Sequence, residues 1–542
     1  MNDNYNIEEL AIKFFPYPTP NPGQIEAIVQ TIKNIINGDN HIIIEAPTGV
    51  GKSVIAATIH KVMRHIKPSF RTTIITATKG LQDQYTEDFN FVTDLKGKQN
   101  YPCIQGSDVG PYGSIQCKSK LRSGKCSLDV CPYVKQRAVW CKEADFRITN
   151  NAFQIKAPPQ LVMLPETKAD LIICDESHEL DETILDHTKL EFTAKDFVEL
   201  GNLGKFNSQK MISQLPEIFK GIKFGEAFYP NKEQLQEIKV IYVECETLIS
   251  EFESLIEEDP KAEGKYAPSI EVLSELSDKL YIIYSSGEEC EWIKLEAKDG
   301  KLELKAVYAS SVSHYGLFRK CEQFVHMSAT ICGTKEYARA LGLKNYSEIT
   351  IDNTIPVDNR KVIVIAKHSL HKYFKDWDSY FGLMNSVLKK HKNERGLIHT
   401  VSFDLANRIK DSLPEDQRER ILISNNRKEI MEYIRSRPDA IIASLSIEKG
   451  YDFKGDLARF QIIAKIPYGF LGDPHIRLNT ERSDAWYARK SILRLVQACG
   501  RAVRGVDDYA KTYIMDAQIL KLLTNHDTIF PDWFLDSLVI LE

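Results

Sequence analysis

A glycine-rich segment near the start of the chain has the composition of a phosphate-binding loop. Residues 46–53 read APTGVGKS, follow the apolar run HIIIEA and open a helical pattern. Backbone N–H groups freed by the two glycines can close around a β-phosphate, Lys52 can reach the β and γ oxygens, and Ser53 can ligand Mg²⁺. The predicted nucleotide-binding residues of this loop are Thr48, Gly49, Val50, Gly51, Lys52 and Ser53.

Two adjacent carboxylates end a second apolar run, LIICDESH at 171–178. Asp175 can complete the Mg²⁺ shell, and Glu176 can act as the base on an attacking water. Adjacent acids at the end of a strand are also common in solvated loops, so the pair alone decides little. Downstream of a phosphate loop, however, these carboxylates become candidates for catalysis of phosphoryl transfer.

The chain has 11 cysteines, too few for a disulfide scaffold at this length, and several of them gather in one short segment. In a reducing compartment such a cluster indicates metal binding before it indicates disulfides. Cys141 falls inside a helical pattern and is read as a non-ligand, although it could replace Cys103. The predicted metal ligands are Cys103, Cys117, Cys126 and Cys131.

The elements that must position these residues alternate between short β-branched runs and helical patterns, which is typical of parallel α/β sheets. The pattern occurs in two separate regions and predicts two open-sheet domains. The expected strands are 41–46, 71–78 and 169–176 in the first region, and 361–368, 396–403, 440–446, 460–467 and 511–517 in the second.

The stretch between these regions lacks the alternation and is expected to be helical. From Leu235 to Leu255 apolar residues recur every three or four positions until Pro260 ends the pattern. Residues 291–310 then alternate around a Asp299-Gly300 turn and predict a β-hairpin. The acidic run at 251–259 is interpreted as a solvated helix face.

Composition excludes some classes of protein. The 542 residues carry a formal net charge of -5, which excludes a histone-like protein that holds nucleic acid by bulk charge, but not one with a local basic groove. The start, MNDNYNIEEL, does not fit a secretory signal, and no apolar run approaches the ~18 residues that cross a bilayer. We expect a cytoplasmic protein with no membrane association.

Eight short strings in chain order resemble the motifs of superfamily 2 helicases, and the order makes the resemblance specific. The 175–178 string resembles the D-E-A-H box, and 46–53 resembles the phosphate loop of that superfamily. The others are Gln24, Thr76-Ala77-Thr78 with Leu81, Gln82 and Gln84, Ser328-Ala329-Thr330, Ser402-Phe403, EKGYDF at 448–453 and QACGRAVR at 497–504.

The resemblance implies functions for these residues. Gln24 would read adenine, Asp452 and Gln497 would contact the nucleotide, and Arg501 and Arg504 would act as arginine fingers from the second sheet. The string at 76–84 would contact the DNA backbone, and 328–330 would link hydrolysis to DNA contact. An arginine pair three residues apart is otherwise common on solvated helix faces.

The cysteine segment lies where the XPD/DinG family carries a [4Fe-4S] domain, and its Cys-Pro-Tyr resembles the DinG version. Zinc is the competing metal, but the usual Cys-x2-Cys knuckles are absent, which favours iron–sulfur. Two strings depart from the family: Asn150-Asn151 replaces Asn-His, and Asp516-Ala517-Gln518 lacks a final arginine. Basic residues outnumber acids in this segment, at Lys96, Lys98, Lys118, Lys120, Arg122, Lys125, Lys135, Arg137 and Lys142 against Asp108 and Asp129.

The resemblance implies an α/β fold with two RecA-like motor domains and two inserts. The first motor domain would comprise 1–95, 146–185 and 311–345, and the second 346–542. The iron–sulfur domain would span 96–145, and a mostly helical arch with a β-hairpin would span 186–310.

The implied activity is that of an ATP- and Mg²⁺-dependent DNA helicase that moves 5'-to-3' on single-stranded DNA, with the iron–sulfur domain as wedge. Its partners would be single-stranded DNA and forked or tailed duplexes, and we expect a monomeric, bacterial or phage-type protein. One alternative is a DNA-stimulated translocase or nucleoprotein remodeller without strong unwinding. Another is a binding or scaffold protein with a degenerate ATPase, which the intact Lys52, Glu176 and Gln497 disfavour.

Overall fold

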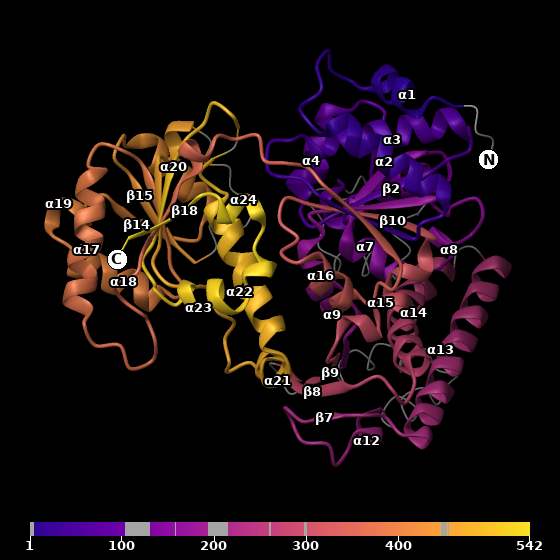
Figure 1. The fold of residues 1–542 in the computed structure, drawn as a ribbon. Helices are drawn as coiled ribbons and strands as arrows, with labels where there is room; N and C mark the ends of the chain where they lie inside the picture. Colours follow the sequence, from indigo (N-terminus) through magenta and orange to yellow (C-terminus); the bar gives the residue numbers. More distant parts are fainter. Residues whose placement is uncertain are drawn as a thin grey trace.

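Two parallel sheets face each other across the molecule in a computed structural model of the chain (Figure 1). The structure describes residues 5–102, 131–157, 159–192, 215–259, 262–297, 301–445, 453, 455–503 and 505–541. Every strand pairing in these two sheets is parallel, as the alternating sequence pattern predicts. The two RecA-like motor domains of the expected α/β fold are therefore present.

The first sheet has the strand order β11-β1-β10-β5-β2-β4-β3 over the described residues. Its central strands β2 and β5 are buried on both faces, because helices cover both sides of a parallel sheet. The strands are β1 (His41–Glu45), β2 (Thr72–Thr76), β3 (Thr93–Asp94), β4 (Phe146–Asn150), β5 (Leu171–Asp175), β10 (Gln323–Ser328) and β11 (Tyr346–Thr350).

The expected boundary at residue 345 between the motor domains is wrong. Strand β11 pairs in parallel with β1, with His41 opposite Tyr346 and Glu45 opposite Thr350, so it belongs to the first sheet. Only one residue of β11, Ile349, is buried, because the strand lies at the sheet edge. The weak apolar signal of an edge strand explains why the sequence pattern did not assign it.

The helices of the first motor domain cover both faces of this sheet. Ile42 and Ile44 of β1 pack with α1, α2 and α3, whereas Ile43 points to the opposite face. The helices are α1 (Ile7–Phe14), α2 (Gln24–Asn37), α3 (Lys52–Ile66), α4 (Lys79–Asp88), α7 (Asn151–Lys156), α8 (Pro159–Val162), α9 (Leu180–Thr188), α15 (Ser313–Gly316) and α16 (Thr334–Leu341).

The second sheet has the order β14-β15-β13-β16-β17-β12-β18. Its strands are β12 (Val362–Ile365), β13 (Gly396–His399), β14 (Ile421–Ile423), β15 (Ile441–Ser444), β16 (Phe460–Ile463), β17 (Lys511–Ile514) and β18 (Leu538–Leu541). The helices around it are α17 (Trp377–Lys390), α18 (Phe403–Ser412), α19 (Glu415–Arg418), α20 (Arg427–Ser436), α21 (Pro474–Arg482), α22 (Asp484–Cys499), α23 (Ile519–Asn525) and α24 (Asp532–Leu535).

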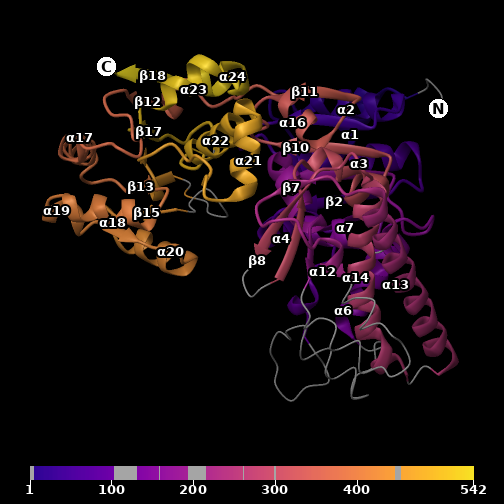
Figure 2. The ribbon, with the colours of Figure 1, turned by 90° about the horizontal axis from the view of Figure 1, so that it is seen from below.

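The arch between β6 and β9 consists of two long helices on a small antiparallel sheet, as the helical period and the alternating hairpin predict. Helices α13 and α14 run side by side away from the first motor domain (Figure 1 and Figure 2). Their buried residues share one hydrophobic core with the face of the first sheet to which Ile43 points, and this shared core anchors the arch. The elements are α12 (Leu215–Ile218), α13 (Lys232–Glu258), α14 (Glu263–Ser286), β6 (Leu190–Phe192), β7 (Ala227–Phe228), β8 (Trp292–Ala297) and β9 (Lys301–Ala306).

The described parts of the cysteine-rich insert are residues 96–102 and 131–145, and the second contains the returning helix α6 (Pro132–Lys142), which leads into β4. Trp140 is fully buried and packs with Leu95, Cys141, Ala157 and Val162. Trp140 is therefore part of a hydrophobic core. Among the described residues, no helix is long and apolar enough to cross a membrane.

Candidate functional site

The phosphate loop connects β1 to α3, at the carboxyl end of the first sheet. Gly49 and Gly51 adopt positive φ angles of 87° and 88°, a region that residues with a Cβ rarely enter. Gly51 is the N-cap of α3 and supplies no side chain to cap it, so the first amides of the helix are available to an anion. The loop thus has the backbone shape that a phosphate requires.

Gln24 lies beside this loop, at the start of α2. Its side-chain amide donates to the carbonyl of Val50 at 2.6 Å, and its carbonyl oxygen accepts from the backbone N–H of Asn21. A Cβ on Gly51 would lie 2.8 Å from the Gln24 amide nitrogen. The predicted adenine-reading glutamine is therefore in direct contact with the phosphate loop.

The two predicted catalytic carboxylates lie opposite this loop at the end of β5. Lys52 Nζ is 3.3 Å from a carboxylate oxygen of Glu176. Asp175 accepts from the hydroxyl of Tyr85 at 3.2 Å and from the backbone N–H of Glu176 at 3.0 Å. Lys52 is far from the adjacent Asp175 and Glu176 in the sequence, and the fold brings it to them at one edge of the sheet.

The two carboxyl groups have different proton affinities. Burial, together with the neighbouring charge of Glu176, raises the pKa of Asp175 to about 6. Burial alone would also raise the pKa of Glu176, but the charge of Lys52 and the hydrogen bond with His178 outweigh it and hold that pKa well below its usual range. Glu176 is therefore ionised at neutral pH, as a general base must be.

The predicted Ser-Ala-Thr string follows β10 and contacts the carboxylate motif through His178. Nδ1 of His178 lies 2.8 Å from the hydroxyl oxygen of Ser328 and 3.3 Å from a carboxylate oxygen of Glu176. The Ser328 hydroxyl oxygen also accepts from the backbone N–H of Thr330 at 3.2 Å. A continuous set of polar contacts therefore joins Glu176 to the loop after β10.

Two residues of the expected DNA-contacting string, Thr76 and Gln82, are buried instead. Gln82 is buried and donates to the carbonyl of Leu95, so it cannot touch DNA in this structure. Its place on α4 puts it on the inner face of the helix, which the string alone did not reveal. Ala77 and Thr78 are exposed, and the Thr78 hydroxyl caps α4.

The structure describes only part of the expected contribution from the second motor domain. Gln497 lies on α22 and is half-buried, and Arg501 follows that helix. Burial lowers the pKa of His399 to about 4, with a smaller contribution from the charge of Arg501. Arg504 and Asp452, like the rest of 446–452, lie outside the described residues.

Of the four predicted metal ligands, only Cys131 belongs to the described residues; Cys103, Cys117 and Cys126 do not. Cys131 is the partly exposed N-cap of α6, a place from which its thiolate could bind a metal held by the preceding segment. Cys141 is buried, and burial raises the pKa of its thiol, both unfavourable for a ligand. Within the described ranges, no group of three or more His, Cys, Asp or Glu side chains could hold a metal ion.

Tyr85 is a site residue that the sequence reasoning missed. It lies one residue after the last position of the expected DNA-contacting string, and burial raises the pKa of its phenol well above the usual value. Its hydroxyl therefore stays protonated and donates to Asp175. An aromatic residue in an amphipathic helix carries no sequence signal for this contact.

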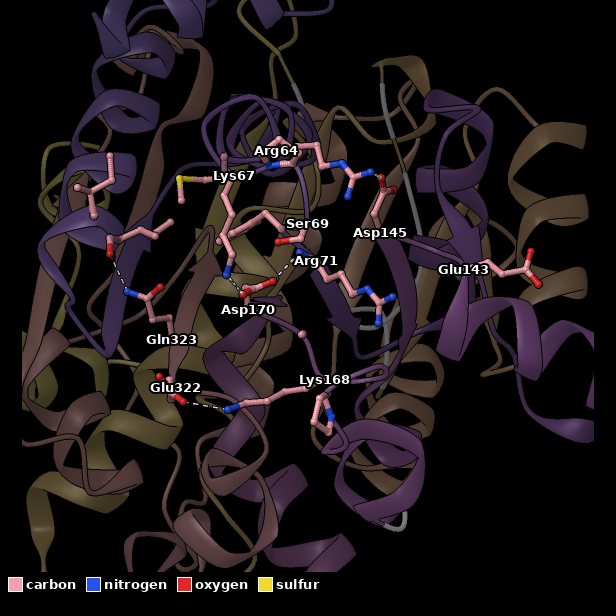
Figure 3. Close-up of a pocket in the computed structure, with 17 residues that line it drawn as sticks. Arg64, Lys67, Ser69, Arg71, Glu143, Asp145, Lys168, Asp170, Glu322 and Gln323 are labelled. Atoms are coloured by element: carbon pink, nitrogen blue, oxygen red, sulfur yellow. Dashed lines mark hydrogen bonds and ion pairs between the residues drawn. The ribbon is translucent and has the colours of Figure 1, made fainter. Parts of the chain in front are cut away.

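A cavity of 760 Å³ lies at the end of the first sheet that is opposite to the phosphate loop (Figure 3). Its lining residues precede β2, β4 and β5, whereas ligands of open α/β sheets bind at the carboxyl ends of the strands. Three of its cations already have carboxylate partners, since Lys67 pairs with Asp170, Arg64 with Asp145 and Lys168 with Glu322. This cavity is not the candidate site.

Comparisons with known proteins agree with the geometry. Residues 384–537 match the family described as "Helicase C-terminal domain", and residues 18–201 match "Type III restriction enzyme, res subunit". The chain is 21% identical to a curated "Probable ATP-dependent helicase" of Methanocaldococcus jannaschii, over 96% of this chain and 93% of that protein.

Solved structures share the fold at low sequence identity. A structure titled "XPD_Helicase" has a TM-score of 0.57 at 14% identity and covers 96% of this chain and 99% of its own. The structure titled "Structure of S. tokodaii Xpd4" has a TM-score of 0.55 at 14% identity, with 96% and 99% covered. These likenesses extend over both motor domains and the arch.

Proposed function

We propose that the protein unwinds duplex DNA while moving 5'-to-3' on a single strand. The proposal starts from its membership of the XPD/DinG-like family of superfamily 2 helicases and from its activity as an ATP-hydrolysing helicase. The observation that carries the ATPase part is the meeting of Lys52, Asp175 and Glu176 at the end of the first sheet. The polarity and the DNA substrate rest on the family resemblance.

In the proposed mechanism, the backbone of the phosphate loop and Lys52 bind the triphosphate, and Ser53 and Asp175 hold Mg²⁺. In the structure, Lys52 pairs with Glu176. A bound triphosphate offers Lys52 a more highly charged partner, which frees Glu176 to accept a proton from the attacking water. His178 then orients the Glu176 carboxylate, 3.3 Å away. Arg501 and Arg504 would stabilise the charge that develops on the γ-phosphate.

A [4Fe-4S] cluster would be held by Cys103, Cys117, Cys126 and Cys131. Four thiolates are the donor set that such a cluster needs, and the one described donor, Cys131, is partly exposed. The cluster would cross-link a segment that has little hydrophobic core of its own. We propose that this domain separates the strands of the duplex ahead of the motor.

Strand displacement on matched forked substrates tests the activity. With ATP and Mg²⁺, a duplex with a 5' single-stranded tail should be unwound, and the same duplex with only a 3' tail should not. Lys52→Ala should abolish both unwinding and DNA-stimulated ATP hydrolysis, whereas Lys33→Ala, on the exposed face of α2, should behave as wild type. Stimulated hydrolysis without unwinding of either substrate would favour a translocase or remodeller instead.

The metal is tested by the colour of the protein. Wild type purified without oxygen should show the broad brown absorbance of iron–sulfur and about four irons per chain. Cys126→Ser should lose that absorbance, and Cys245→Ser, which removes a buried thiol of the arch, should keep it. A colourless wild type with stoichiometric zinc would overturn the choice of metal.

A further inference from the structure

Helix α22 of the second motor domain crosses to the first and contacts it with two adjacent cations. Arg489 donates to the backbone carbonyls of Ile331 and Cys332, each at 3.0 Å. Both carbonyls belong to the loop that follows Ser328-Ala329-Thr330. The guanidinium also lies over the ring of Tyr337 on α16, 5.5 Å from its centroid. Arg489 is buried, so this contact is part of the interface between the motor domains.

Lys490 makes the second contact, to the helix that follows the catalytic carboxylates. Its ammonium is 2.8 Å from a carboxylate oxygen of Asp181 and 3.0 Å from one of Glu182. The side chains of Lys490 and Asp181 are each only 5% exposed. Asp181 is in the first turn of α9, six residues after Asp175. A displacement of the end of β5 is therefore carried directly to Lys490.

The loop that Arg489 holds is itself tied to the ATPase site at its other end. Ser328 contacts His178, and the carboxylate of Glu45 accepts from the backbone N–H of Ile331 at 2.9 Å. Cys332 has a positive φ of 54°, a conformation that is strained for a residue with a Cβ and persists only when its surroundings hold it. The loop is thus fixed from both motor domains.

Helix α22 also carries Gln497, seven residues after Lys490, and leads to Arg501. A straight helix rises about 1.5 Å per residue, so the two cations lie roughly 10 Å along the axis from Gln497. The rigid helix therefore joins the contacts with α9 and the loop to the nucleotide-facing end of the second motor domain.

We propose that Arg489 and Lys490 are positioning residues that couple the two motor domains, so that a change at the catalytic carboxylates moves the second domain. This inference rests on the proposed function. It adds a second set of contacts between the two motor domains, besides the arginine fingers. The contacts act at both the helix that follows the catalytic carboxylates and the loop after β10, which is connected to Glu176 through His178. A coupling free energy between sites is what such shared contacts produce.

Two buried charges at an interface can also hold two domains together without coupling them. The ratio of the ATPase rates with and without DNA distinguishes coupling from simple attachment. The measurement is the rate of ATP hydrolysis by the full-length protein with and without a single-stranded dT oligonucleotide, over a range of ATP concentrations. Lys490→Met should lower the stimulation by DNA about tenfold while the basal rate and the KM for ATP stay within about twofold of wild type. Lys490→Arg, which keeps the charge, should retain the stimulation.

A second variant guards against misfolding. Lys490→Met leaves Asp181 buried without its cation, which can unfold the interface. The double variant Asp181→Asn/Lys490→Met removes both charges and should fold, yet it should show the same loss of stimulation. Lys521→Gln, on the exposed face of α23, is the matched control and should keep the wild-type ratio.

The outcomes distinguish this inference from the function on which it rests. A wild-type protein without DNA stimulation would contradict the proposed function. A stimulated wild type together with an equally stimulated double variant would overturn the coupling alone. Loss of stimulation in Lys490→Arg as complete as in Lys490→Met would also overturn it, because packing rather than charge would then be the cause.

Discussion

At the scale of single residues, two neighbouring carboxylates are given different chemistry by their surroundings. Asp175 is buried and hydrogen-bonded to Tyr85, whereas Glu176 lies within ion-pair distance of Lys52 and His178. The pKa of Asp175 is raised, and the pKa of Glu176 is lowered. Mg²⁺ favours an ionised carboxylate, so metal binding must displace the proton that Asp175 holds at acidic pH.

This arrangement predicts a pH-dependent requirement for Mg²⁺. The Tyr85 hydroxyl donates to the ionised form of Asp175 and so lowers its pKa; Tyr85→Phe should raise it further above about 6. Protons then compete with Mg²⁺ up to a higher pH. The acid limb of the Mg²⁺-dependent ATPase profile should move up by about 0.5–1 pH unit, with wild-type activity restored above roughly pH 8.

Steady-state ATPase rates between pH 5.5 and 8.5 at several Mg²⁺ concentrations measure this shift. Tyr373→Phe removes a hydroxyl from an exposed ring and should leave the profile unchanged. An acid limb at the wild-type pH in Tyr85→Phe would show that Asp175 does not control metal binding.

At the scale of elements, the buried guanidinium of Arg147 on β4 holds the returning helix of the cysteine-rich insert. It donates to the carbonyls of Trp140 and Cys141, each at 3.1 Å, and to the hydroxyl of Thr73 on β2 at 2.8 Å. It also stacks on the Trp140 ring at 4.4 Å. These contacts fix the end of α6 to the first sheet.

Arg147→Met should fill much of the same volume but leave several buried oxygens without donors. We expect the free energy of unfolding to fall by about 2–4 kcal/mol, measured by urea denaturation, and amide hydrogen exchange in α6 to accelerate. Arg435→Met, on the exposed face of α20, serves as the control. Unchanged exchange in α6 would contradict the assignment of Arg147 as the anchor of this helix.

At the scale of the whole molecule, the second motor domain contacts the base of the arch as well as the first motor domain. Arg482 at the end of α21 forms a bidentate ion pair with the buried Glu291, which precedes β8. His475 and Asn479 on the same helix face the backbone carbonyl of Val307. A rotation of the second motor domain must therefore carry the base of the arch with it or break these contacts.

Glu291→Gln should weaken this contact by about 1.4 kcal/mol, since the ion pair becomes a hydrogen bond from the Arg482 cation to a neutral amide. Local opening would then increase about tenfold, and hydrogen exchange of the amides in α21 and β8 should accelerate by that factor. Mass-spectrometric exchange compares the variant with Glu289→Gln, an equal charge change on an exposed side chain two residues away. Equal exchange in the two variants would count against the ion pair as a joint between the arch and the motor.

The chain's formal net charge of -5 says little about its partners at this scale. The acidic run at 251–259 lies at the end of α13 on the arch, whereas the basic excess of the cysteine-rich segment lies far from it in the sequence. Electrostatic attraction of a DNA backbone depends on local charge within roughly a Debye length, about 10 Å at 0.1 M salt. The overall charge was therefore no evidence against DNA.

The sequence by itself determined the two parallel sheets, the helical arch with its hairpin and the residues of the phosphate loop. These features depend on local patterns: buried β-branched runs, a helical period, and glycines in a fixed strand-to-helix context. It missed the edge strand β11, of whose residues only Ile349 is buried, so that the strand carries no such pattern. It also could not tell that Gln82 faces inward while Gln84 of the same string is exposed.

Only the tertiary structure decided which distant side chains meet. Tyr85 reaches Asp175 because α4 folds back over the carboxyl end of β5, and Lys490 reaches Asp181 because two separately folded domains pack together. Such contacts join residues separated by 90 and 309 positions and leave no local periodicity. A buried lysine or tyrosine reads in the sequence as one more helical residue, and its partner becomes evident only when packing removes both from water.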